Sequence, residues 1–139
     1  MQWWAWALIS ALAAAATSIL AKLGMQRIPS NLATAIRTIV ILVFAWTLVL
    51  ARGEAGRLGE INRRSLLFLV LSGLATGISW LAYFRALETG PASRVVPIDK
   101  LSLVFAAVLA VLVLRETVSV RYVVGLLLVL AGVWVTTFS

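Results

Sequence analysis

The sequence has 139 residues, of which 63% are hydrophobic and only 12% are charged, and its mean hydropathy is +1.06. An average soluble domain is about half apolar and about a quarter charged, and a small one buries only about two-thirds of its surface. This composition therefore argues against a soluble globular fold. The chain also has no Cys and no His, which removes the disulfides of a secreted scaffold and the usual ligands of zinc, haem or iron–sulfur sites. We expect no cofactor and no metal.

The net charge of +7 comes from 12 Lys and Arg against 5 Asp and Glu. No basic cluster stands on a polar face, so we expect no nucleic-acid partner. In a membrane protein the same excess of positive charge lies in the short loops that determine orientation.

Five apolar runs follow one another along the chain, and each has the length of about 20 residues that a helix needs to cross the hydrocarbon core. None of them alternates as the strands of a membrane barrel do. The first run lacks the basic start of a signal peptide and is longer than its apolar region, so we interpret it as a span. The sequence predicts an all-α integral membrane protein with a single domain over residues 1–139. The runs are Trp3–Leu23, Leu32–Ala51, Leu66–Phe84, Val95–Leu114 and Tyr122–Phe138, with the last helix expected over about 120–138.

Short connections join the predicted helices. Ser30 or Asn31 is a plausible N-cap for the second helix, and Gly90-Pro91 is a strong stop after the third. Pro97 is placed in the first turn of the fourth helix, where proline is tolerated. Either Pro97 only starts this helix, or it forms a hinge or frees carbonyls that bind an ion.

The basic residues are nearly balanced between the two sides of the membrane. With the N-terminus inside, six arginines fall in inner loops and four basic residues in outer loops; Arg37 and Lys100 make the tally even if they extend to the outer side. Near balance indicates insertion in both orientations, and the alternative is one orientation with a modest bias. Because five spans put the termini on opposite sides, two copies in series would be inverted, which is a common transporter architecture.

Three charges lie several residues inside predicted spans, namely Arg37, Asp99 and Lys100. A charge inside a membrane costs at least about 2.5–3.5 kcal/mol and by default indicates function. Arg37 and Asp99 lie at similar depths, so they are predicted to pair across the second and fourth helices. This pair is either structural, with Lys100 extending to the surface, or part of a site for a substrate or a coupling ion.

Polar and small residues recur at helical spacing in the third and fourth helices. The hydroxyl stripe is a candidate pathway lining, but such stripes also form ordinary hydrogen bonds between helices. The neighbouring stripe contains a G-x-x-x-G motif, which lets two helices approach closely. These residues are Ser72, Thr76, Ser79 and Tyr83 on one stripe, Gly73, Gly77, Trp80 and Phe84 on the other, and Ser102 three residues after Asp99.

The last helix is different, because from Val123 to Val135 its only polar side-chain atom is the ring nitrogen of Trp134. It offers Gly125, Ala131 and Gly132 to a neighbour. Helices one to four are therefore expected to line a polar pathway, and the fifth to serve packing or dimerisation.

Several segments resemble an EamA domain, the repeat unit of the drug/metabolite transporter superfamily. They are "NLATAIRTIVILVFAW", "GLATGISWLAYFRAL", "YFRALETGPASRVVPIDKL" and "VLRETVSVRYVVGLLLVLAGVWV". The resemblance covers essentially the whole chain and one repeat, whereas most members carry two repeats and ten helices. It implies a five-helix, single-repeat member.

The resemblance implies a small-molecule permease with a central cavity lined by the first four helices of each repeat. The sequence departs from the family pattern at Arg115-Glu116, where many members have Gly-Glu. This difference predicts a less tight turn. The first helix also lacks the embedded glutamate of related small multidrug resistance proteins, so Asp99, then Glu88, are the candidates for proton coupling. The residues placed nearest the cavity or its gate are Arg37, Trp80, Tyr83, Arg85, Pro97, Asp99 and Lys100.

The sequence is compatible with three functions. The first is a secondary transporter of small metabolites in a bacterial-type inner membrane, working by alternating access as a homodimer that is antiparallel. The charges expected on one side of the membrane have a positive excess, which favours an anionic or zwitterionic substrate. The alternatives are a non-transporting accessory subunit and a flippase of a lipid-linked substrate. No nucleophile–base pair or metal cluster supports an enzyme.

Overall fold

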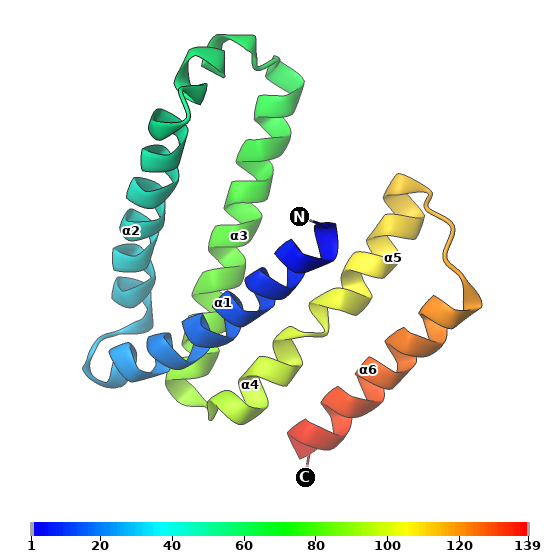
Figure 1. The fold of residues 1–139 in the computed structure, drawn as a ribbon. Helices are drawn as coiled ribbons and strands as arrows, with labels where there is room; N and C mark the ends of the chain where they lie inside the picture. Colours follow the sequence, from blue (N-terminus) through cyan, green and yellow to red (C-terminus); the bar gives the residue numbers. More distant parts are fainter. Residues whose placement is uncertain (1, 139) are drawn as a thin grey trace. The chain divides into compact units, whose positions relative to one another are not determined.

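The computed structural model describes residues 2–138, in which helices are joined by short connections (Figure 1). Five of its segments are long and apolar enough to cross a membrane, which confirms the predicted fold class. They are Trp3–Arg27, Ser30–Ala51, Arg63–Thr89, Ala92–Leu114 and Val120–Phe138. The helices are α1 (Trp3–Gly24), η1 (Met25–Arg27), α2 (Ser30–Ala51), η2 (Glu54–Glu60), α3 (Arg63–Thr89), α4 (Ala92–Asp99), α5 (Ser102–Leu114) and α6 (Val120–Phe138).

The chain divides into two compact units. We call residues 20–88 the α2–α3 unit, which contains the end of α1, η1, α2, η2 and nearly all of α3. We call the described residues 2–19 and 89–138 the α4–α6 unit, which contains the rest of α1 together with α4, α5 and α6.

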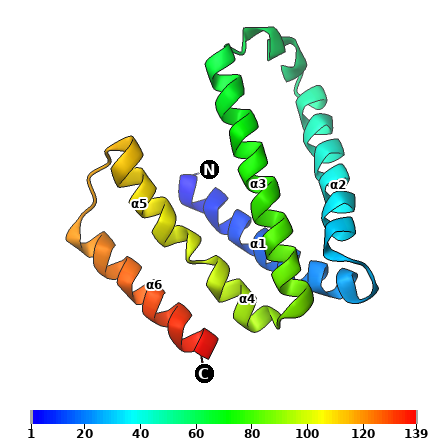
Figure 2. The same cartoon turned by 180° about the vertical axis from the view of Figure 1, so that it is seen from behind.

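In the α2–α3 unit, the helices α2 and α3 run side by side in opposite directions, as Figures 1 and 2 both show. Gly53 follows α2 with φ +67°, a left-handed conformation that glycine adopts without strain and that ends a helix. After η2, the Asn62 side chain accepts a hydrogen bond of 2.7 Å from the backbone N–H of Ser65, as an N-cap residue does. The connection is therefore specified locally at both of its ends.

Most buried residues of this unit lie at the opposite end, where η1, the start of α2 and the end of α3 meet. Phe84 and Leu87 are 2% and 0% exposed, whereas most of the large apolar side chains on α2 and α3 are exposed. That pattern suits a protein whose solvent is lipid. The buried residues of the unit are Ala21, Met25, Ser30, Thr34, Phe84 and Leu87.

In the α4–α6 unit, the fourth span is broken into α4 and α5, and α4 packs against α6 (Figure 2). At the break, Lys100 and Leu101 donate their backbone N–H groups to carbonyls three residues earlier, each at 3.0 Å. This is the tighter 3₁₀ pattern that often marks a change of direction. The break lies three residues after Pro97.

Pro97 lies inside α4 and not in its first turn, so the prediction that it starts the helix was wrong. The connection at Gly90-Pro91 is shorter than the gap between the predicted runs, because α3 continues to Thr89. Pro91 is the N-cap, and α4 begins directly after it at Ala92. Pro97 therefore has no N–H for the carbonyl of Ser93, one turn earlier in the same helix.

The turn after α5 is as tight as a glycine would make it. Arg115 adopts φ 56°, the left-handed conformation, and Glu116 donates its N–H to the carbonyl of Ala110 at 3.2 Å. The less tight turn expected from Arg115 was wrong. The arginine accepts the conformation that glycine is usually found in at the end of a helix.

Candidate functional site

The guanidinium of Arg37, on α2, lies against two aromatic rings of α3. Its guanidinium carbon lies 4.2 Å from the ring centroid of Phe84 and 5.4 Å from that of Trp80. The two residues are one helical turn apart, so their rings lie on the same side of α3. Three long side chains thus connect α2 and α3 within the membrane span.

The charge of Arg37 is not neutralised within its own unit. The side chain is half-buried, and its Nη1 atom is buried without a hydrogen-bond acceptor. Cation–π contacts contribute about 0.5–2 kcal/mol, whereas an arginine costs about 2.5–3.5 kcal/mol at the centre of a span and less nearer its end, where Arg37 lies. The rings therefore offset part of the cost of placing this cation in the membrane.

The N-terminus of α2 has no local side-chain cap. The N-cap is Pro29 and Ser30 is the first helical residue, so the prediction of Ser30 or Asn31 as N-cap was wrong. Glu88, in the last turn of α3, instead accepts hydrogen bonds from the hydroxyl and the backbone N–H of Ser30. Arg85 holds the same carboxylate, with its Nη1 2.8 Å from Oε2.

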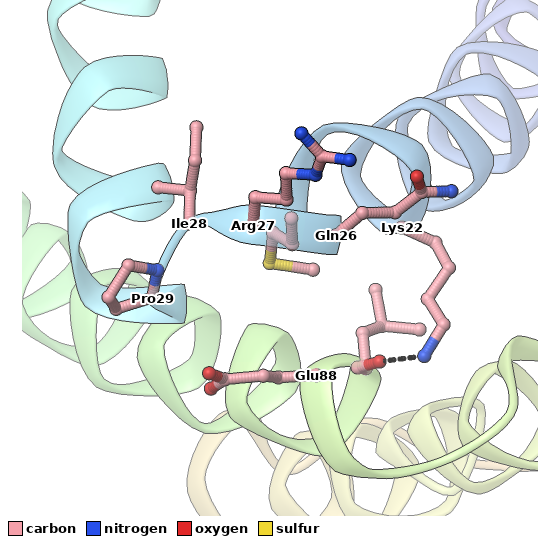
Figure 3. Close-up of a pocket in the computed structure, with 8 residues that line it drawn as sticks. Lys22, Gln26, Arg27, Ile28, Pro29 and Glu88 are labelled. Carbon is pink, nitrogen blue, oxygen red and sulfur yellow. Dashed lines mark hydrogen bonds between the residues drawn. The ribbon is translucent and has the colours of Figure 1, made fainter.

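A polar cavity of about 480 Å³ opens beside this contact. Figure 3 shows Lys22 reaching from α1 to the backbone carbonyl of Leu87, to which its Nζ donates a hydrogen bond, and Glu88 extending toward Pro29. Lys22 thereby binds a carbonyl in the last turn of α3, where a cation is favoured by the helix dipole. Opposite charges thus hold two helix ends at the wall of one cavity.

Several threonine hydroxyls are used within their own helices, including that of Thr76 on the hydroxyl stripe. The hydroxyls of Thr34, Thr38 and Thr76 donate to carbonyls four residues earlier at 2.8–2.9 Å. Such bonds satisfy the hydroxyl without a partner helix. A role for Ser72, Thr76 and Ser79 in a pathway therefore stays a prediction.

Asp99 and Lys100 lie at the break between α4 and α5. Their side chains form an ion pair of 3.4 Å, and both are partly exposed. Ser102 begins α5 two residues after Lys100. Because Arg37 belongs to the α2–α3 unit and Asp99 to the α4–α6 unit, the predicted ion pair between them stays a prediction.

The small residues expected to pack helices have open space around them. Among the described residues, a Cβ added at Gly73, Gly77, Gly125 or Gly132 would meet nothing within 4 Å. Ala131 lines an apolar groove of about 610 Å³ between α6 and the end of α4. Their role in packing against a further helix stays a prediction.

Sequence reasoning missed the roles of Phe84, Ser30 and Lys22. It placed Phe84 on a stripe without connecting it to Arg37, and it counted Lys22 only as a loop charge. One signal was available. Glu88 is an acidic residue at the C-terminal end of a helix, where the dipole disfavours it, which indicates that it serves another helix end.

The model of the family described as "EamA-like transporter family" matches residues 1–138. A Sinorhizobium protein named "Uncharacterized transporter in cobO 3'region" is 50% identical over 130 residues, which cover 94% of this chain and 92% of that protein. The "Probable 4-amino-4-deoxy-L-arabinose-phosphoundecaprenol flippase subunit ArnE" of Erwinia tasmaniensis is 33% identical over 84 residues, or 60% of this chain and 78% of that protein. No solved structure matches the chain significantly.

Proposed function

The chain belongs to the EamA-like transporter family and is a multi-pass membrane transporter; on this premise we propose that it is a secondary transporter of small metabolites. In this proposal two copies pair in opposite orientations and alternate between two open sides. The proposed location is a bacterial inner membrane, which the bacterial origin of both relatives supports.

The observation that carries the proposal is the number of spans. Five spans put the two termini of one copy on opposite sides of the membrane. A second copy in the opposite orientation then supplies the inverted half on which many transporters are built. The alignment covers 92% of the Sinorhizobium transporter, so a relative that is named as a transporter has little beyond these same five spans.

The broken fourth span supports a moving element in this transporter. Discontinuous helices form substrate and ion sites in many transporters, because their free backbone groups lie at membrane depth. Here the break between α4 and α5 lies beside Asp99 and Lys100. We propose that Pro97 and this break form a hinge, that Asp99 is the coupling carboxylate, and that Glu88 is the second candidate.

Uptake into proteoliposomes tests this function. The purified protein is reconstituted, a proton or sodium gradient is imposed, and uptake of labelled amino acids and organic anions is measured. Gradient-driven, saturable uptake of at least one solute is expected. Absence of uptake across the panel would count against transport of metabolites.

Labelling of the termini tests the antiparallel arrangement separately. A tag at each end is probed in cells with a reagent that does not cross the membrane. Labelling of each terminus from both sides is expected for a chain that inserts in both orientations. Uniform labelling would contradict an antiparallel pair of identical chains and would require either a parallel dimer or a different partner chain.

A second candidate function is the flipping of a lipid-linked substrate. It is favoured by the Erwinia relative, whose name is that of a flippase subunit. The apolar groove of about 610 Å³ between α6 and the end of α4 is suited to an acyl or prenyl chain. To test it, a fluorescent prenyl phosphate is placed in proteoliposomes, and dithionite is added outside to quench the molecules of the outer leaflet. Quenching that extends to the inner-leaflet molecules, without solute uptake, would select this function.

A further inference from the structure

We propose that Arg37 binds the anionic group of the transported solute, so that the substrate is a small carboxylate or phosphate compound. The proposal rests on the transport function above. The rings of Phe84 and Trp80 hold the guanidinium in one orientation, 4.2 and 5.4 Å from their centroids.

Stacking leaves the edge of the guanidinium unused. A guanidinium has five N–H donors in one plane, and aromatic rings contact its face. The Nη1 atom of Arg37 is buried and has no acceptor. The N–H groups of Nη1 therefore have no acceptor among the described residues, and an oxyanion at the edge of the guanidinium would satisfy them, as carboxylates and phosphates do when they bind arginine.

The carboxylates of the α2–α3 unit are accounted for elsewhere. Glu54 and Glu60 lie in η2, at the opposite end of α2 from Arg37. Glu88 accepts hydrogen bonds from Ser30 and pairs with Arg85. Within residues 20–88, no acidic side chain neutralises Arg37, so any counter-charge comes from outside this unit, either from Asp99, as the sequence predicts, or from the solute, as proposed here.

The position of Arg37 suits a solute that enters from one side. It lies seven residues after Ser30, or about 10 Å along the axis from the start of α2. An anion at this depth has left the headgroup region and is surrounded by apolar side chains. There a cation binds it more strongly than the same cation would in water.

Trp80 provides a local probe for a binding experiment. A variant with every tryptophan except Trp80 replaced by Phe is reconstituted in phosphatidylcholine nanodiscs, and its fluorescence is followed during titration. One arm adds inorganic phosphate or succinate against chloride at constant ionic strength. A second arm replaces phosphatidylcholine stepwise with phosphatidylglycerol, which tests a lipid phosphate as the source of the anion.

A saturable change in one arm is expected, and the responding arm identifies a free solute or a lipid as the source. The change is expected to disappear in Arg37→Gln and to need about tenfold more anion in Arg37→Lys, because lysine lacks the planar fork. Arg64→Gln is the matched control, since Arg64 also lies over a ring, that of Phe68 at 5.9 Å, but at the exposed start of α3. It is expected to respond as the parent does.

Thermal unfolding of the chain with all its tryptophans provides a second readout that does not depend on the tryptophan replacements. The responding anion should raise the midpoint of the parent and not that of Arg37→Gln. No response to any anion in either assay, or an equal response in Arg37→Gln, would overturn the proposal. Neither assay needs a gradient, so both measure anion binding separately from transport. If anion binding fails but gradient-driven uptake of another solute is observed, the proposal for Arg37 is wrong and the transport function stands.

Discussion

The carboxylate of Glu88, in the last turn of α3, accepts hydrogen bonds from the hydroxyl and backbone N–H of Ser30, the first residue of α2. An acidic side chain is unfavourable at the end of its own helix and favourable at the start of another. The contact therefore links two helix ends through the charge of one residue, and Arg85 at 2.8 Å keeps that residue in place.

Glu88→Gln should loosen the start of α2. The amide keeps the shape of the side chain but loses the charge that attracts both the N–H groups of α2 and the Arg85 guanidinium. We expect the thermal midpoint in nanodiscs to fall by several degrees, and a similar fall for Ser30→Ala. Hydrogen exchange should become faster in the first turn of α2.

Glu60→Gln is the control for this prediction. Glu60 pairs with Arg57 at 3.9 Å, and both side chains are more than 70% exposed, so its loss should be nearly neutral, as for most surface pairs. Equal midpoints for Glu88→Gln and Glu60→Gln would show that the Ser30 contact does not hold α2.

Phe84→Leu separates the ring of Phe84 from its bulk. Leucine still fills much of this fully buried position, but it cannot place a ring against the guanidinium of Arg37, which lies 4.2 Å from the centroid. We expect a loss of stability of about 1–2 kcal/mol from the missing cation–π contact and imperfect packing. Unfolding in mixed micelles measures it. Phe68→Leu, at the exposed ring under Arg64, should change stability much less.

The features that could be predicted from the sequence follow from local properties of the chain. The five spans are visible because apolar length alone decides whether a helix crosses a bilayer. The intramembrane charge of Arg37 is visible for the same reason, as an exception within an apolar run. The stop at Gly90-Pro91 is visible because these residues restrict the backbone locally.

What could not be predicted depends on contacts between helices. Nothing near Ser30 in the sequence indicates that its partner lies in the last turn of α3, and nothing near Lys22 indicates the carbonyl of Leu87. The predicted position of Pro97 in its helix was wrong, because the local sequence does not distinguish a proline in the first turn of a helix from one in its interior. Only the position of the preceding N-cap, Pro91, decides between the two.

Arg115→Gly should stabilise the protein. Arg115 has φ 56°, and this left-handed conformation costs a residue with a side chain about 1–2 kcal/mol. Glycine avoids this cost, but its greater conformational entropy in the unfolded chain cancels part of the gain. We expect a gain of about 0.5–1 kcal/mol in the free energy of unfolding. Arg52→Gly is the control, because Arg52 ends α2 with φ −90° and has no such strain to relieve. A loss of stability in Arg115→Gly would mean that the arginine side chain itself holds the turn.

Asp99→Asn should abolish gradient-driven uptake while the protein still inserts and dimerises. Asparagine keeps the size of the side chain but cannot bind and release a proton. The ion pair with Lys100 at 3.4 Å is partly exposed, so its loss should cost little stability. Uptake and thermal unfolding are measured on the same preparation. Parental uptake in Asp99→Asn would remove Asp99 from the coupling step, and failure to fold would favour a structural role.

Gly125→Leu and Gly132→Leu should weaken the proposed dimer without harming the single copy. A Cβ added at either position meets nothing within 4 Å among the described residues, so the protomer has open space where the new side chain begins. In a dimer that packs through α6, the same side chain would separate two helices that small residues bring together. We expect dimerisation to weaken at least tenfold, or about 1.4 kcal/mol, in a dilution series by single-molecule photobleaching.

Leu127→Ala is the matched control for these glycine variants. Leu127 lies on the opposite face of α6 from the two glycines, because it is two residues after Gly125 and five before Gly132, and it is 58% exposed. Its truncation should leave the dimer intact while changing the apolar surface by a similar amount. If all three variants dimerise as the parent does, α6 does not form the contact between copies, and the G-x-x-x-G of α3 at Gly73 and Gly77 becomes the next surface to substitute.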